Sequence, residues 1–170
     1  MARQNGITRG DREARGAHLK ERIYLSFSAL AVVSTMGGHG DPTAGEAAVT
    51  LFVTALGTLL AVFTADVISH TIVNEHFPSR HEVAETVRTT FSAAIAIVPV
   101  FLLLAAAGVG WWETTTALRA STVVLVASLV LIGWVAVRRV PLTFWQRALA
   151  LAAEAVLGVA VVLLQRLAHG

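Results

Sequence analysis

Asp66, His70 and Asn74 interrupt an apolar stretch, AVFTADVISHTIVNEH (residues 61–76), with an acid, an imidazole and an amide. Their four-residue spacing places the three side chains one above another on one face of an α-helix. A carboxylate beside an imidazole can pass a proton, because histidine titrates near neutral pH. Both groups also bind divalent cations, but a metal site needs three or four ligands and this helix offers two, so a metal is left open. The stretch therefore predicts a proton- or ion-binding site at Asp66 and His70, with Asn74 in support.

Arg88 is the expected charged neighbour of this site. It lies about one turn into the next apolar stretch, where its guanidinium could pair with Asp66 and neutralise it. The alternative interpretation is an interfacial cluster that water and lipid headgroups solvate, without any ligand.

A second acid, Glu154, falls near the middle of the last apolar stretch, residues 142–167. An acid at the bilayer midplane costs about 2.5–3.5 kcal/mol on insertion scales, and burial raises the pKa of a carboxyl group. Arg147 and Gln165 fall on nearly the same line of this helix. We therefore predict Glu154 as a midplane proton or ion site, with Arg147 and Gln165 in support. The alternative is a neutral acid whose hydrogen bond to another helix fixes packing.

These residues lie in a chain with the composition of a membrane protein. Of its 170 residues 55% are hydrophobic and 14% are charged, whereas a soluble domain carries about 25% charge. Five apolar stretches approach or exceed the roughly 20 residues that a bilayer core requires. They cover about residues 23–38, 47–73, 89–110, 118–137 and 142–167. We predict an all-α polytopic integral membrane protein with five transmembrane helices (residues 23–168), preceded by a basic cytoplasmic tail (residues 1–22) that is largely frayed.

Two residues are predicted to shape these helices. Pro99 lies in the middle of the third stretch, where it removes a backbone donor and should kink the helix. Glu46 falls at the start of the second helix, where the helix dipole favours an acid.

The basic residues predict an orientation. With the N-terminus in the cytoplasm, all 13 Lys and Arg residues except Arg119 and Arg166 fall on the cytoplasmic side. Membrane proteins carry such an excess on their cytoplasmic segments. We therefore predict a multi-pass protein of the bacterial plasma membrane with its N-terminus inside and its C-terminus outside. The same bias favours an uncleaved first helix over a cleaved signal peptide.

Composition and motifs exclude several classes of function. The chain has no cysteine, which excludes disulfides, thiolate metal sites and cysteine nucleophiles. It has no G-x-S-x-G, H-E-x-x-H, Walker or G-x-G-x-x-G motif, so we predict that it is not an enzyme and uses no cofactor. Its basic residues flank apolar stretches, so no nucleic acid is expected. The expected partners are the lipid bilayer, a divalent cation or proton, and a second copy, because one copy has few helices to enclose a pathway.

Three stretches resemble the vacuolar iron transporter family in layout. AVFTADVISH is similar to the family's second helix, which has an acid near its inner end. RTTFSAAIAIVPVFLL is similar to its proline-bearing third helix, and VRRVPLTFWQRAL resembles its link into the last helix. The resemblance implies a five-helix cation transporter and carries over Asp66 alone, since the family's Asn-Asp-Gly signature is absent from SFSALAVVSTMGG. The chain is equally similar to uncharacterised five-helix membrane proteins of actinobacteria, which imply no activity.

We predict that the protein moves a small cation or a proton through its helix bundle. Glu154 is the expected midplane site, and Asp66 and His70 form the cytoplasmic gate or relay. One alternative is a structural or accessory subunit in which Glu154 and Asp66 mediate helix association and nothing is transported. Another is a sensor whose arginine-rich tail binds anionic lipid or a partner.

Overall fold

The computed structural model describes residues 9–38 and 41–138, and in the last part of the chain only separate residues between 143 and 163. The predicted fifth helix (142–167) therefore falls largely outside the described residues. Arg147, Glu154 and Gln165 also lie outside them.

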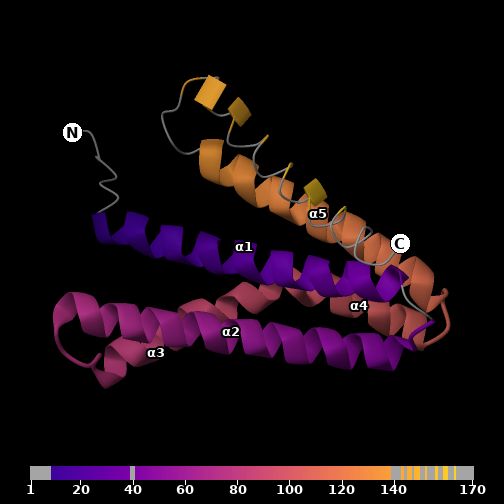
Figure 1. Cartoon of the computed structure of the whole chain (residues 1–170), viewed down its shortest axis with the longest axis horizontal. Helices are drawn as coiled ribbons and strands as arrows, with labels where there is room; N and C mark the ends of the chain where they lie inside the picture. The colour runs from indigo at the N-terminus through magenta and orange to yellow at the C-terminus, as the bar shows by residue number, and fades with distance from the viewer. Residues whose placement is uncertain are drawn as a thin grey trace, which may run out of the picture.

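The regular structure of the described residues is entirely helical (Figure 1). Long helices run side by side, and short connections join them at the two ends of the bundle. In chain order the elements are α1 (Arg9–Gly38), α2 (Ala44–Asn74), α3 (Arg80–Ser92), the 3₁₀ segment η1 (Ala93–Ile97), α4 (Val98–Gly108) and α5 (Thr114–Arg138).

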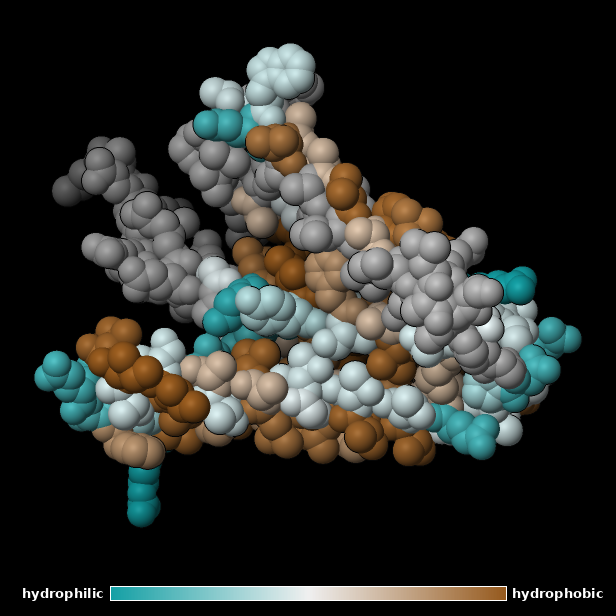
Figure 2. Space-filling view, viewed as in Figure 1, coloured by the Kyte–Doolittle hydropathy of each residue, from teal (hydrophilic) through white to brown (hydrophobic). Residues whose placement is uncertain are grey.

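Three helical segments are long and apolar enough to cross a membrane: α2, the run from α3 through α4, and α5 as far as Ala136. Their outward faces are apolar. On α2, for example, Phe52, Leu60 and Ile72 are exposed. Figure 2 shows hydrophobic side chains along the length of the bundle and hydrophilic ones gathered toward its ends. The prediction of an all-helical fold is confirmed for the described residues, among which these three segments could cross a membrane.

α1 lies at the centre of the bundle, in contact with α2, α3, η1 and α5 (Figure 1). It is 30 residues long, which corresponds to about 45 Å of helix. Leu25, Leu30 and Val33 of this helix are fully buried. Residues 9–22, predicted to belong to a frayed tail, instead form the first half of α1. His18, Lys20 and Glu21 of this half have partners on α2 and α3, and these contacts hold it against the bundle.

Two helices begin with the same capping arrangement. The Thr43 hydroxyl accepts a hydrogen bond from the Glu46 amide (3.3 Å), and the Glu46 carboxylate accepts one from the Thr43 amide (2.9 Å). Ser79 and Glu82 repeat this pairing at the start of α3, with distances of 3.4 and 2.7 Å. Such a pair satisfies two amides that have no partner within the helix. The predicted role of Glu46 is confirmed, and at α3 the same pairing also fixes the position of Glu82.

The third apolar stretch is broken in its middle, as Pro99 predicts. α3 passes into η1, and α4 restarts at Val98 with Pro99 in its first turn. Proline has no amide hydrogen, and in a regular helix its ring would clash with the carbonyl of Ile95; the first helical turn tolerates both defects. The break separates α3, which borders polar groups of α1, from α4, which packs into the apolar core through Val100 and Leu104.

The residue after α2, Glu75, has its backbone in the left-handed region (φ 56°, ψ 18°). A residue with a Cβ is disfavoured there by about 1–2 kcal/mol, whereas glycine is not. We expect Glu75→Gly to raise the free energy of unfolding by about 1 kcal/mol, seen as a higher Tm in detergent micelles. The matched control is Ala65→Gly. Ala65 has an exposed side chain and lies away from the ends of α2, where glycine costs about 1 kcal/mol. A rise in Tm for both variants, or for neither, would contradict this explanation.

Candidate functional site

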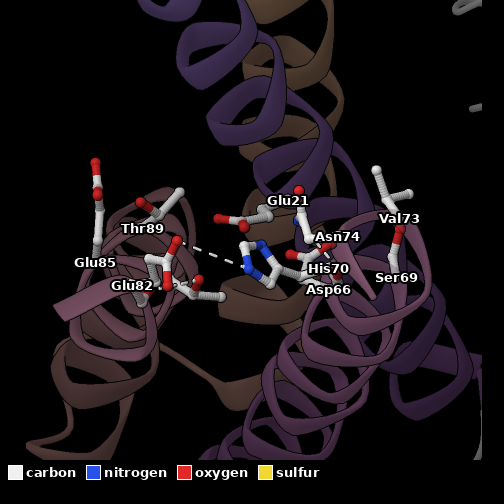
Figure 3. A pocket seen from close by; sticks show the side chains of 10 residues that line it. Glu21, Asp66, Ser69, His70, Val73, Asn74, Glu82, Glu85 and Thr89 are labelled. Carbon is white, nitrogen blue, oxygen red and sulfur yellow. Dashed lines mark hydrogen bonds and ion pairs between the residues drawn. The ribbon is translucent and has the colours of Figure 1, made fainter. Parts of the chain in front are cut away.

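One end of the bundle holds an open pocket with a volume of about 590 Å³. It forms where the first half of α1 meets the last turns of α2 and the first turns of α3 (Figure 3). Asp66, His70 and Asn74, which the sequence places on one helix face, all line this pocket. The lining residues are Glu21, Asp66, Ser69, His70, Val73, Asn74, Glu82, Glu85, Thr86 and Thr89.

Glu21 is the most deeply buried acid among the described residues, with 2% of its surface exposed. Its Oε1 accepts a hydrogen bond from the Thr90 hydroxyl of α3 (3.3 Å), and its Oε2 is buried without a hydrogen-bond partner. Four-residue steps lead from Glu21 to the buried Leu25, Ala29 and Val33, so Glu21 continues the inward face of α1. An unpartnered carboxylate oxygen is unusual in an interior, where most polar atoms are hydrogen-bonded.

Asp66 pairs with a lysine of α1. The Nζ of Lys20 lies 3.1 Å from Asp66 Oδ1, and the two side chains are 45% and 27% exposed. Arg88, predicted to be this partner, is exposed on α3 and does not line the pocket. The predicted Arg88–Asp66 pair is therefore not formed, because α1 extends far enough toward its N-terminus to bring Lys20 against α2.

His70 lies one turn after Asp66 on α2 and faces Glu82 of α3 (Figure 3). Its Nε2 lies 3.8 Å from Glu82 Oε1, too far for a hydrogen bond but close enough for attraction if the ring is protonated. The same nitrogen is buried and has no hydrogen-bond partner. The Asn74 amide donates to the His70 carbonyl (3.0 Å), and the His76 ring lies edge-on to the His70 ring at 5.8 Å. These contacts place an imidazole with a free nitrogen beside a carboxylate.

Glu21 holds a proton more tightly than an ordinary glutamate. It precedes the apolar run of α1, and burial raises its pKa above the usual value of 4.5. The nearby Asp66 carboxylate raises this pKa further, whereas the Thr90 hydrogen bond and the Lys20 charge act more weakly in the opposite direction. Burial and the neighbouring carboxylate together favour the protonated form of Glu21.

The raised pKa of Glu21 predicts a pH dependence of stability. The folded protein binds this proton more tightly than the unfolded chain does. The contribution of Glu21 to the free energy of unfolding is therefore present in full below pH 4.5 and is lost as the pH rises through the pKa of the folded state. We expect Tm in micelles to fall less steeply just above pH 4.5 in Glu21→Gln than in the wild type. Glu113→Gln, at an exposed acid between α4 and α5, should keep the wild-type slope. Equal slopes for all three proteins would contradict the raised pKa.

No group of three or more His, Asp or Glu side chains in the described part of the chain is placed to hold a metal ion. Asp66 and His70, left open as metal ligands by the sequence, therefore do not form such a group with their described neighbours. What the pocket offers is carboxylates, an imidazole and hydroxyls, which bind protons and positively charged groups.

Four charged residues of the pocket region are not among those that the sequence predicts for the site: Lys20, Glu21, Glu82 and Glu85. A signal existed for two of them. Glu21 lies four residues before Leu25 on the face that runs into the first apolar stretch, and S-R-H-E at residues 79–82 has the spacing of a capping box. No comparable pattern marks Lys20 as the partner of Asp66.

Comparison of the chain with models of protein families, with curated proteins and with solved structures gives no match. The likeness to the vacuolar iron transporter family therefore rests on the three sequence stretches alone. The geometry of the pocket is the stronger basis for a function.

Proposed function

We propose that this chain is a multi-pass protein of the bacterial plasma membrane that moves a proton or a small cation across the bilayer. In this proposal the pocket is where the ion enters the bundle from the cytoplasm. One observation carries the proposal: Glu21 is buried beside Asp66, and one of its carboxylate oxygens has no hydrogen-bond partner.

This placement opposes folding rather than helping it. Burial and a neighbouring carboxylate both disfavour the ionised form of Glu21, and an unpaired oxygen adds a desolvation cost. A carboxyl group needed only for packing would be expected to have both oxygens paired. Perturbed acids of this kind gather at functional sites. We therefore assign Glu21 and Asp66 as the inner ion site, with His70 and Glu82 at its entrance.

The proposed orientation places the pocket on the cytoplasmic side. The first half of α1, the α2–α3 connection and the end of α5 all lie toward the pocket end of the bundle (Figure 1). Basic residues mark cytoplasmic segments. The first half of α1 contains Arg9, Arg12, Arg15, Lys20 and Arg22, α3 contains Arg80 and Arg88, and α5 ends at Arg138. Five membrane helices, with the N-terminus inside and the C-terminus outside, complete the proposal, and Glu154 of the fifth would offer a second acid deeper in the bilayer.

Proton flux into proteoliposomes tests this function. A pH-sensitive dye trapped in the vesicles reports how fast an imposed pH gradient collapses, and divalent cations are then added in turn. We expect the wild type to exceed protein-free vesicles and Asp66→Asn to be about tenfold slower, because asparagine neither binds a proton nor neutralises a cation. Glu113→Gln should match the wild type. A folded wild type that moves neither protons nor cations would overturn the proposal.

An accessory role has its own supporting observation. Gly57, Ala61 and Ala65 place small residues on the exposed face of α2, and within the described structure the space beside Gly57 is open. Small residues let another membrane helix approach closely. In this alternative a partner helix packs against that face, and the same face could join two copies in the proposed homodimer. Chemical cross-linking of a folded but flux-free wild type would then capture a partner through α2.

A further inference from the structure

Acids line both walls of the pocket. Glu21 and Asp66 come from α1 and α2, and Glu82 and Glu85 come from the first turns of α3 on the opposite wall (Figure 3). Lys20 offsets the charge of Asp66. Negative charge still exceeds positive charge around the pocket, and this favours a ligand with more than one positive charge.

The inner wall also has polar atoms without a hydrogen-bond partner. Glu21 is almost wholly buried, yet its Oε2 has no partner, and the Nε2 of His70 is likewise buried without a hydrogen bond. Hydroxyls of Ser69, Thr86 and Thr89 lie among the lining groups. A ligand that donates several hydrogen bonds would satisfy atoms that the described structure leaves unpaired.

The kind of cation follows from what the walls contain. The described residues form no group of three ligands for a metal ion, and a volume of about 590 Å³ is large for a bare ion. None of the lining residues is Phe, Tyr or Trp, so the pocket lacks the ring faces that recognise quaternary ammonium groups. Primary ammonium groups fit better, because each carries three N–H donors for carboxylates and hydroxyls.

We propose that the pocket binds a linear aliphatic cation with a primary ammonium group at each end. One ammonium donates to Glu21 and Asp66, and the other donates to Glu82 and Glu85 across the pocket. This inference names the cation class of the proposed function and rests on it for the identity of the site.

Calorimetric binding to the full-length protein tests the ligand class. The protein is placed in nanodiscs of phosphatidylcholine, whose quaternary headgroup supplies no primary ammonium, and titrated with 1,4-diaminobutane. We expect 1-aminobutane, which has one ammonium group, to bind at least about tenfold more weakly than the diamine. The analogue of the diamine with both nitrogens fully methylated should bind as weakly, because it has no N–H donor. Equal binding of the monoamine would overturn the two-ended ligand and indicate a single ammonium, such as that of a lipid headgroup.

Variants of the two walls test the placement. Glu21→Gln and Glu85→Gln should each raise the Kd of 1,4-diaminobutane by about tenfold, whereas Glu113→Gln should leave this Kd unchanged. Because Glu85 is exposed, its variant stays informative even if Glu21→Gln fails to fold. Unchanged affinity in Glu85→Gln would remove the second ammonium site.

The two proposals fail in different ways. Diamine binding without any flux in proteoliposomes would overturn transport and leave the ligand class standing. Proton flux without diamine binding would overturn the ligand class and leave transport standing. Stoichiometric displacement of the diamine by Mg²⁺ at equal concentration would overturn the diamine in favour of a metal.

Discussion

Glutamine in place of Glu21 is expected to abolish ion flux, with the rate falling by about a hundredfold or more. The variant keeps the length of the side chain, and its amide oxygen can still accept the hydrogen bond that Thr90 donates over 3.3 Å. It loses the ability to bind a proton or to neutralise a cation. Flux through reconstituted wild type and Glu21→Gln, followed with the trapped pH-sensitive dye, checks this prediction.

The matched control for Glu21→Gln is Thr90→Val. Valine removes the hydroxyl that orients Glu21 but leaves its charge, so flux should change by only a few-fold. If both variants lose flux equally, the effect comes from geometry rather than from the carboxyl group. Wild-type flux in Glu21→Gln would exclude Glu21 as the ion site.

Leu30→Ala is expected to lower the free energy of unfolding by about 2–5 kcal/mol. Leu30 has no exposed surface and lies on α1, which other helices surround. Truncation leaves a cavity whose lining atoms lose their van der Waals partners, a loss that also applies between helices in lipid. Unfolding in detergent micelles, by heat or denaturant, measures the change.

Leu60→Ala provides the comparison for Leu30→Ala. Leu60 lies on α2 with 49% of its surface exposed, so the same truncation opens no cavity among the described residues and should cost about 1 kcal/mol or less. Similar losses for the two variants would mean that α1 is not the central helix.

The sequence predicts features that depend on neighbours within a few residues. The four-residue spacing of Asp66, His70 and Asn74 identifies their common face, because helix geometry alone determines it. Pro99 and Glu46 act on the turn in which they lie, and both have the predicted effect. Each of these features is local, and periodicity or capping rules describe it directly.

Contacts between distant residues could not be predicted in this way. Lys20 lies 46 residues from Asp66, and Thr90 lies 69 residues from Glu21. Periodicity shows which face of a helix is apolar but not which helix packs there. The polar composition of residues 9–22 suggests a frayed tail, yet these residues are helical, and His18, Lys20 and Glu21 among them have partners on α2 and α3. Arg88 lies at the start of the next apolar stretch, which made it the expected partner of Asp66, but tertiary packing brings Lys20 to Asp66 instead.

The 3₁₀ segment η1, which precedes Pro99, separates α3 from α4 and makes α3 a short helix of its own. α3 has 13 residues and is therefore about 20 Å long, with η1 at one end and Glu82 near the other. A rotation of about 10° at η1 swings the far end through about 3 Å. That arc is comparable to the 3.8 Å between His70 and Glu82, so a small tilt of α3 would change the width of the pocket mouth without moving the core contacts of α4.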